Sequence, residues 1–444
     1  MSKENLSSEV VEEKLGFGED YPLEHVPQKA RVSIVSISAV LLGFTFFTPT
    51  MLAGAEVGVS FKLWPDFFLV LLAGSAILGL YVAILSVIGA RTGLTTVLLS
   101  RYTLGTAGAK WADILLGGTQ IGWYGVTAAT MAHLFAQAIG WESYIIPLMI
   151  FWSFLMGITA YYGYKGMEIL SYISVPLILI MGFWVIFKAV GETGGWGAVN
   201  MIEPTGAMTI GAAITVIVGT FASGGTQAPN WTRFSKTAKI AFWSALIAFL
   251  LGNGLMLFFG AIGAITYQES DFVMVLYNMG LIFWGIIFLT LNLWTTNDNA
   301  AYAFGVAGAE LFDVNDKRPF VVGGVIIATI LAVTGIYDYL ATYLTMLGIF
   351  IPPLGGVIMG DYFFVWKGEI PVLSDMEFSQ IRWSGITSYI LGSGAAIIGN
   401  TMELGIPALN GIIVAAVVMP IVEKIFKNMG YSQLPDLEDK ETIG

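Results

Sequence analysis

Long apolar runs alternate with short polar segments from residue 32 onward, and this pattern determines the fold class. Twelve runs are long enough to cross a bilayer, because a helix needs ~20 apolar residues to span the hydrocarbon core. They cover residues 32–58, 64–90, 111–139, 143–164, 167–191, 207–227, 238–264, 279–304, 319–336, 339–363, 384–404 and 407–426. The pattern therefore predicts an all-α polytopic membrane protein with twelve transmembrane helices.

Both ends of the chain are polar, and the basic residues are unevenly placed between the runs. We expect residues 1–30 to form a mobile cytoplasmic tail and residues 427–444 a second one, with no cleavable signal peptide. With twelve spans and the N-terminus inside, every Lys and Arg except Lys62 and Lys188 falls in a cytoplasmic segment. The positive-inside rule therefore predicts a multi-pass protein of the inner (plasma) membrane with both termini cytoplasmic.

Two of the twelve runs contain residues that interrupt a helix at membrane depth. The first reads LLGFTFFTPTMLAGAEVG, and Pro49 predicts a break near residues 46–48 because proline lacks a donor and clashes with the preceding turn. The sixth reads ITVIVGTFASGGTQAPN, where three glycines and a proline disfavour an unbroken helix. Irregular backbone at this depth is tolerated where protein buries it or where it lines a cavity.

The two interrupted runs stand at matching positions, since each begins a unit of five spans. We therefore predict a first five-helix repeat at 31–191, a second at 207–363 and two further helices at 384–426. Broken helices at corresponding positions point to an inverted-repeat transporter with its binding site at the breaks. The alternative is ordinary glycine and proline kinks, which we would prefer if only one span were interrupted.

The eighth run carries polar residues on one side. Asn292, Thr295 and Thr296 are spaced by three and four, so they share a helical face. One amide and two hydroxyls suit a small polar ligand or a bare cation better than they suit hydrocarbon. In the alternative interpretation, the threonine hydroxyls bond back to carbonyls of their own helix.

The third run offers a second candidate group. Gln120 and Trp123 are three residues apart and share a face. A primary amide donates and accepts hydrogen bonds, as does the edge of a nucleobase. An indole stacks on planar rings, which contributes ~1 kcal/mol beyond area burial. An interhelical hydrogen bond and a packed tryptophan explain the pattern equally well.

Titratable groups are scarce in the spans. The chain has no cysteine and two histidines, and His133 in span three is expected to be packed and hydrogen-bonded rather than a proton relay. We place the span carboxylates near the helix ends, and we interpret Asp298 as a capping or gating group. They are Asp66, Asp113, Glu168, Asp298 and Asp361. Because proton-coupled carriers usually use an intramembrane titratable group, this favours sodium coupling and an uncharged substrate.

Seven stretches, spread over residues 27–425, carry a resemblance to a known family. They are LLGFTFF (41–47), GARTGLTT (89–96), LLGGTQIGW (115–123), VGTFASGGT (218–226), LGNGLMLFFGA (251–261), LNLWTTNDNAAY (291–302) and IPPLGGVIMGDY (351–362). Together they resemble the bacterial cytosine permeases of the nucleobase:cation symporter-1 family. The resemblance implies a leucine-transporter-like 5+5 inverted repeat with two additional helices, and uptake of a nucleobase coupled to a cation by alternating access.

The resemblance also implies site residues. It places the substrate at Gln120, Trp123, Thr220, Phe221, Ser223 and Asn292. It places a sodium ion among Thr295, Thr296, Asn292 and carbonyl groups at Gly43 and Phe46. The expected partners are therefore a small heterocycle, Na⁺ as the co-transported ion and the lipid bilayer. Another cofactor, nucleic acid and covalent chemistry are not expected.

Two positions depart from the family pattern and leave the substrate open. Thr220 stands where the family has serine, and Gln227 stands where it has an apolar residue. Cytosine is the first expectation. A purine, uracil, allantoin, a hydantoin or a thiazole precursor, or coupling to protons, remains an alternative, and a channel or an intramembrane enzyme fits the sequence less well.

Overall fold

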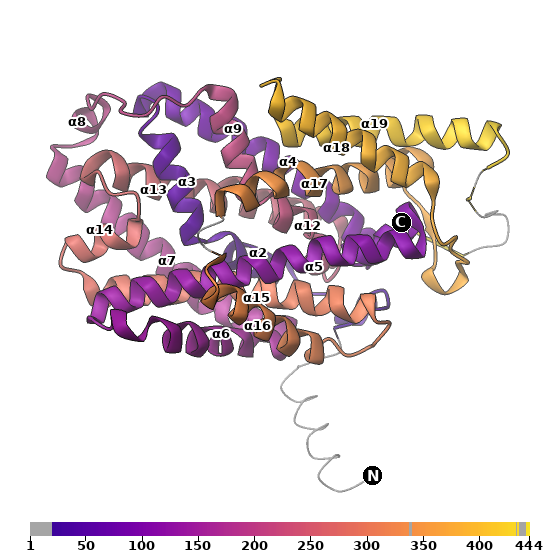
Figure 1. The fold of residues 1–444 in the computed structure, drawn as a ribbon, viewed down its shortest axis with the longest axis horizontal. Coiled ribbons are helices and arrows are strands. Elements are labelled where there is room, and N and C mark those ends of the chain that lie inside the picture. The colour runs from indigo at the N-terminus through magenta and orange to yellow at the C-terminus, as the bar shows by residue number, and fades with distance from the viewer. Residues whose placement is uncertain (1–19, 337–339, 432, 435–440) are drawn as a thin grey trace, which may run out of the picture.

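The structure, a computed structural model, describes residues 20–336, 340–431, 433–434 and 441–444. It is built almost entirely of helices (Figure 1). The first half contains α2 (Ile34–Thr45), α3 (Thr48–Gly58), α4 (Phe68–Thr92), α5 (Thr96–Ile139), α6 (Ile145–Tyr161), α7 (Tyr164–Thr193) and α8 (Trp196–Asn200). The second half contains α9 (Ile210–Gly219), α10 (Ala222–Thr226), α11 (Pro229–Thr232), α12 (Ala238–Leu246), α13 (Asn253–Tyr267), α14 (Phe272–Asn278), α15 (Ile282–Leu311), α16 (Arg318–Val333), α17 (Leu340–Gly360), α18 (Trp383–Thr401) and α19 (Pro407–Asn428).

Each of the twelve predicted runs coincides with a helix or a broken helix, which confirms the all-helical class. Among the described residues, six helical segments are long and apolar enough to cross a membrane, and the bent pair α2–α3 makes a seventh. Others are shorter or less apolar, such as α9 and α16. The total of twelve membrane crossings stays a prediction.

Glycines set several helix boundaries. Gly93 ends α4 and Gly140 ends α5, with φ of 71° and 72°, a left-handed conformation that costs glycine little. Gly105, with φ of 81°, interrupts α5. The amide nitrogens that follow it donate to loop carbonyls instead, as Thr106 does to Ser379 (3.0 Å). The continuous part of α5 that contains the third apolar run therefore begins just after Gly105, several residues before residue 111, where the hydropathy pattern placed the start of the span.

Two helices of different halves, α3 and α13, touch through their backbones. A Cβ atom on Gly260 would overlap the carbonyl oxygen of Met51, and one on Gly54 would overlap that of Leu257. Such close approach between membrane helices needs small residues and increases van der Waals contact. Elsewhere α5 packs against α15 and α16, and α18 and α19 lie beside α17 along one edge of the molecule (Figure 1).

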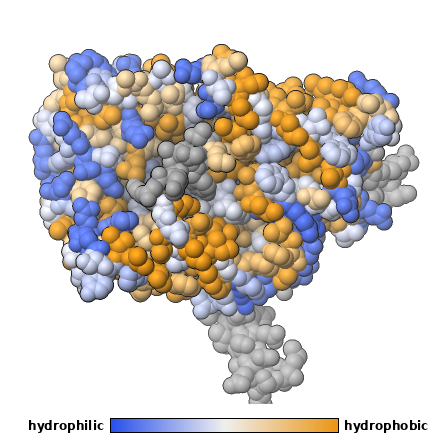
Figure 2. All heavy atoms as spheres, in the orientation of Figure 1, coloured by the Kyte–Doolittle hydropathy of each residue, from blue (hydrophilic) through white to orange (hydrophobic). Residues whose placement is uncertain are grey.

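Large apolar side chains cover much of the molecular surface, as Figure 2 shows for one face. Leu69, Phe151, Ile180, Phe187 and Ile398 are more than half exposed. A soluble protein rarely exposes extended apolar patches, so this surface fits contact with lipid. His133 is also exposed on α5, so the expectation of a packed histidine is wrong.

The two polar ends are partly docked. Residues 1–19 lie outside the described part of the chain, but Val26 is fully buried and Tyr21 accepts a hydrogen bond from Arg233 through its carbonyl (2.6 Å). The expectation of a mobile tail is therefore wrong for residues 20–30, because a buried guanidinium binds their backbone. Near the C-terminus, strand β2 (Thr442–Ile443) pairs antiparallel with β1 (Ile370–Pro371).

Candidate substrate and cation sites

The first span breaks where the sequence predicts. Helix α2 ends at Thr45, Phe46 and Phe47 are extended, and α3 begins at Thr48 at an angle of 62° to α2. Pro49 occupies the first turn of α3, where its missing N–H is not needed. The break leaves carbonyl groups at the end of α2 without their usual helical partners.

The sixth span breaks in the same region of the molecule. Helix α9 ends at Gly219, and Phe221 has φ −131° and ψ 19° before α10 begins. The two breaks meet through aromatic rings, since the centroids of Phe44 and Phe221 lie 5.2 Å apart in an edge-on arrangement. The predicted interruption of both spans is confirmed, and the breaks face each other.

A small central pocket lies between these breaks, α5 and α15. It is lined by Phe44, Phe47, Gln120, Trp123, Thr127, Thr220, Phe221, Ser223, Gly224, Thr296, Asn297 and Ala300. Its volume is about 20 Å³, which is room for little more than one water molecule. The structure thus brings together five of the six predicted substrate residues, in a pocket that is nearly closed.

Aromatic rings close the pocket. Phe47 lies edge-on to Trp123 at 5.5 Å and to Phe221 at 6.0 Å between ring centroids. A planar ligand between Trp123 and Phe221 would have to displace Phe47. The sequence signal for Phe44 and Phe47 is the run of aromatic residues in the interrupted first span, which the sequence-based site prediction did not use.

Two buried amides in the pocket have unused hydrogen-bonding atoms. Gln120 is 1% exposed, and its Nε2 has no partner among the described residues. Asn297 is fully buried, and its Oδ1 likewise has none, although its Nδ2 donates to the Tyr124 carbonyl (3.4 Å). An unpaired buried polar group costs ~1–3 kcal/mol, so both atoms favour a ligand that pairs with them.

The two residues that depart from the family pattern have different surroundings. The Thr220 hydroxyl donates to the Ile217 carbonyl (2.7 Å) and accepts from Asn253 Nδ2 (3.1 Å), while the residue lines the pocket. Gln227 is fully buried outside the pocket lining, and its Nε2 donates to the Ser223 carbonyl (3.4 Å). Gln227 therefore lies behind Ser223, and Thr220 is the one in a position to contact a ligand.

The predicted cation residues converge where α15 crosses the break of α2. The Thr296 hydroxyl lies 3.2 Å from the Phe44 carbonyl oxygen and 3.1 Å from that of Phe46. The Thr295 hydroxyl donates to the carbonyls of Leu291 (2.8 Å) and Asn292 (3.1 Å). Both threonines therefore bond back to their own helix, as in the alternative interpretation, and Thr296 also reaches across to α2.

A serine of α7 adds an oxygen that the sequence pattern did not identify. A Cβ atom on Gly43 would lie 2.5 Å from Ser171 Oγ and 3.4 Å from Thr295 Cβ, so these three residues adjoin. Ser171 is fully buried, and its hydroxyl has no partner among the described residues. Among those residues no cluster of three or more His, Cys, Asp or Glu could hold a metal. Neutral hydroxyl and carbonyl oxygens at a helix break suit Na⁺.

The side chain of Asn292 points away from the pocket. The Thr48 hydroxyl donates to its Oδ1 (2.7 Å), and its Nδ2 lies 3.7 Å from Met256 Sδ. Asn292 is absent from the pocket lining because α3 captures its amide. Its backbone carbonyl, however, accepts from both threonine hydroxyls, including that of Thr296 (3.2 Å).

Asp298 lies deeper than the sequence analysis placed it. Helix α15 continues to Leu311, so Asp298 is near the middle of the helix rather than at its end. It is fully buried, its Oδ1 accepts from Asn299 Nδ2 (3.0 Å), and its Oδ2 has no partner in the described part of the chain. The expectation that it caps a helix end is therefore wrong.

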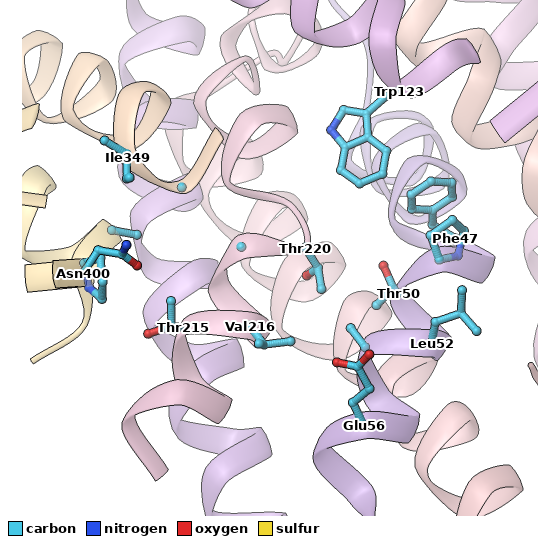
Figure 3. Close-up of a pocket in the computed structure, with 16 residues that line it drawn as sticks. Phe47, Thr50, Leu52, Glu56, Trp123, Thr215, Val216, Thr220, Ile349 and Asn400 are labelled. Atoms are coloured by element: carbon cyan, nitrogen blue, oxygen red, sulfur yellow. The ribbon is translucent and has the colours of Figure 1, made fainter. Parts of the chain in front are cut away.

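A second, larger cavity adjoins the central pocket and shares Phe47, Trp123 and Thr220 with it. It measures about 300 Å³ and extends along α3 to Glu56 (Figure 3). Helices α2 and α3 together run through the molecule, so Glu56 lies at the end opposite Arg31. On the Arg31 side, large residues such as Trp231 are fully buried. The larger cavity therefore approaches the closed central pocket from the side of Glu56, where the two share Phe47, Trp123 and Thr220.

Comparison with known proteins identifies the family to which this chain is related. Residues 25–424 match the family described as permeases for cytosine/purines, uracil, thiamine and allantoin. The cytosine permease of Escherichia coli (strain K12) is 38% identical over 371 residues, which are 83% of this chain and 87% of that protein. The allantoin permease of Bacillus subtilis (strain 168) is 22% identical over 435 residues, 84% of this chain and 85% of that protein.

Solved structures confirm the predicted leucine-transporter-like fold class. Mhp1, a nucleobase-cation-symport-1 family transporter in a closed conformation with bromovinylhydantoin bound, aligns with a TM-score of 0.80 and 16% identity over 91% of this chain and 95% of that chain. Its inward-facing conformation aligns with a TM-score of 0.76. The chain belongs to the family of permeases for cytosine/purines, uracil, thiamine and allantoin, and it is a multi-pass membrane transporter rather than an enzyme.

Proposed function

We propose that the protein imports a nucleobase, with cytosine the first candidate, by sodium symport and alternating access. The observation that carries the proposal is that two candidate sites lie next to each other where the breaks of the first and sixth spans meet. The central pocket offers unpaired amide atoms between aromatic rings. The neighbouring candidate cation site offers neutral oxygens that converge from several helices. The 38% sequence identity with the E. coli cytosine permease supports cytosine as the substrate.

In this proposal the base lies flat between Trp123 and Phe221, after Phe47 has moved. Gln120 and Asn297 pair with its edge, since both residues line the pocket and each amide has an atom without a partner among the described residues. Ser223 and Thr220 contribute hydroxyl or backbone groups at the break of span six. Of the predicted substrate residues, Asn292 acts through its backbone and through Thr48 rather than by touching the base.

The cation takes its ligands from three helices. Carbonyl oxygens of Gly43 and Phe46 come from α2, the hydroxyls of Thr295 and Thr296 with the Asn292 carbonyl come from α15, and Ser171 adds a hydroxyl from α7. Thr296 also lines the substrate pocket. Sodium that holds α2 against α15 therefore fixes the position of Phe44 and Phe47, which couples ion binding to the shape of the pocket.

The orientation follows the charge distribution. We propose that both termini are cytoplasmic, that 31–191 and 207–363 are the two five-helix repeats, and that 384–426 adds two helices. The face containing Glu56 is then the outer face of the inner membrane. The larger cavity becomes an outer vestibule, and the packed side near Arg233 becomes the closed inner gate.

The test is uptake of radiolabelled cytosine into proteoliposomes with and without an inward sodium gradient. Unlabelled adenine, uracil, allantoin and hydantoin serve as competitors. We expect saturable cytosine uptake that the sodium gradient stimulates. Saturable, sodium-driven uptake of another of these heterocycles would correct the substrate and make Thr220 the residue to exchange for serine. Flux that does not saturate for any of them would contradict a carrier.

Asp298 favours proton coupling as a second candidate. It is a buried carboxyl in the middle of α15, and its Oδ2 has no partner among the described residues. The sequence predicts no carboxylate at the membrane midplane, so this position is unexpected. Membrane carriers commonly use such a group for protons. Uptake driven by a pH gradient without sodium, and lost in Asp298→Asn, would establish this candidate. Sodium-driven uptake that persists in Asp298→Asn would exclude it.

A further inference from the structure

The larger cavity has the dimensions of a binding site of its own. It encloses about 300 Å³ between α3, α9, α17 and the facing ends of α18 and α19. Small-molecule sites are typically clefts of about 300–1,000 Å³. The central pocket, at about 20 Å³, is too small for a heterocycle until its aromatic side chains move. The structure therefore offers a space in which a ligand fits before the central pocket opens.

Glu56 gives this cavity a specific chemistry. Of the residues that line it, Glu56 alone is charged. The side chain is exposed on α3, and among the described residues no ion pair involves it. A carboxylate only accepts hydrogen bonds, so it favours a ligand that presents N–H donors. Figure 3 shows its oxygens directed into the cavity.

Thr50 supplies a second, independent sign of a ligand. It is 1% exposed and lines the cavity, and its hydroxyl has no partner among the described residues. Thr50 and Glu56 are six residues apart on α3, which separates them by ~9 Å along the helix axis. Asn400 of α18 lies across the cavity from Glu56 in Figure 3. The carboxylate of Glu56, the hydroxyl of Thr50 and the amide of Asn400 thus surround one largely apolar cavity.

We propose that this cavity is a vestibular subsite that holds an amino-bearing heterocycle before it enters the central pocket. Glu56 accepts a hydrogen bond from the exocyclic amino group, and Thr50 pairs with the ring at the inner end of the cavity. Hydrogen bonds to an ionised carboxylate are shorter and stronger than neutral ones. A ring that presents a carbonyl at this position places one hydrogen-bond acceptor against another, the Glu56 carboxylate, and its binding is therefore disfavoured. The inference rests on the proposed function and refines its substrate class.

The experiment measures equilibrium binding of radiolabelled cytosine to the full-length protein in lipid nanodiscs with sodium present. We expect two saturable phases, a tighter one at the central pocket and a weaker one at the vestibule. Glu56→Gln should weaken the second phase at least tenfold and leave the first unchanged. Thr50→Val should weaken the second phase by a smaller factor, and Gln120→Ala should remove the first phase and retain the second. Pyrimidin-2-one, which lacks the amino group, should show no second phase.

The matched control is Glu403→Gln, an exposed carboxylate in the loop between α18 and α19 that does not line the cavity. It should bind as the wild type does. A single cytosine phase in the wild type, or a second phase that survives Glu56→Gln, overturns the subsite and leaves the proposed function standing. Equal loss in Glu403→Gln overturns it as well. Absence of any saturable heterocycle binding contradicts the proposed function itself.

Discussion

At the scale of single residues, we expect the proposed recognition of the substrate to depend most on the Gln120 amide. Gln120→Ala removes both a donor and an acceptor and leaves the polar edge of the bound base unpaired. At ~1–3 kcal/mol for each unpaired group, we expect uptake efficiency to fall about 100-fold. Uptake kinetics in proteoliposomes measure this. The control is Gln137→Ala, an exposed glutamine on the same helix α5, which should leave uptake unchanged. Wild-type uptake in Gln120→Ala would contradict the pocket assignment.

In the proposed sodium site, the hydroxyls of Thr296 and Ser171 should determine the affinity for the ion. Thr296→Val keeps the shape but removes the oxygen that reaches the α2 carbonyls, and Ser171→Ala removes the unpaired oxygen beside Gly43. We expect each to raise the sodium concentration for half-maximal uptake by about tenfold, the effect of ~1.4 kcal/mol, while the affinity for the base at saturating sodium changes less.

Two variants keep this sodium prediction specific. Thr296→Ser retains the hydroxyl and should restore sodium dependence. Ser153→Ala removes a buried serine hydroxyl of α6 that also has no partner among the described residues, away from both sites. It should have wild-type sodium affinity. An equal rise in Ser153→Ala would mean that the effect is general destabilisation.

The asparagines of α15 show how far sequence reasoning reaches at this scale. The face shared by Asn292, Thr295 and Thr296 was predictable from spacing, and the structure brings their oxygens together. Asn297 is five residues from Asn292, so it points to a different face, and it is the one that lines the pocket. Spacing defines faces of a helix. Which face meets the pocket depends on how neighbouring helices rotate it, and no local pattern contains that information.

At the scale of elements, the contact between α3 and α13 makes these helices one unit. Gly260→Ala places a methyl against the Met51 carbonyl, which forces the helices apart. Overpacking of this kind costs ~1–3 kcal/mol, so we expect a lower unfolding temperature and reduced uptake. Thermal unfolding in detergent measures the first effect. Gly191→Ala is the control, since a Cβ there meets nothing within 4 Å. An unchanged melting temperature in Gly260→Ala would contradict the close packing.

The helix breaks were predictable, whereas several helix ends were not. Pro49 and the glycines of span six act locally, so their effect on the backbone is visible in the sequence. Hydropathy, by contrast, detects only the apolar part of a helix. The continuous part of α5 begins just after Gly105 and α15 ends at Leu311, both beyond their apolar runs. This extension is why Asp298 proved to be central in its helix.

At the scale of the whole molecule, the segment 20–30 packs on the side of the proposed inner gate. Lys317 lies 3.1 Å from Asp20 Oδ2, and Asp20 Oδ1 accepts from the Tyr164 backbone nitrogen (3.2 Å). Arg233 donates to the Tyr21 carbonyl and to the Tyr302 hydroxyl (3.0 Å). One short segment thus connects the start of α7, the end of α11 and the start of α16. The sequence shows only a polar tail here, because its binding partners are more than a hundred residues away.

Removing the Asp20 carboxylate should therefore open the pocket toward this face. Asp20 and Lys317 have side chains only 14% and 3% exposed, and a buried ion pair that loses one partner is strongly destabilised. The chain contains no cysteine, so Ala300→Cys places a single thiol in the central pocket. We expect Asp20→Ala to increase labelling of that thiol by a membrane-impermeant maleimide about tenfold in inside-out vesicles.

The direction of labelling makes this result informative about the transport cycle. Glu24→Ala, an exposed carboxylate on the same segment, is the control and should label as slowly as the parent protein. In right-side-out vesicles, Asp20→Ala should slow labelling. The variant shifts the equilibrium toward the inward-open state, so fewer molecules are open to the outside. Faster labelling from both sides would indicate a general loosening of the fold, and the segment 20–30 would then stabilise the protein without acting as a gate.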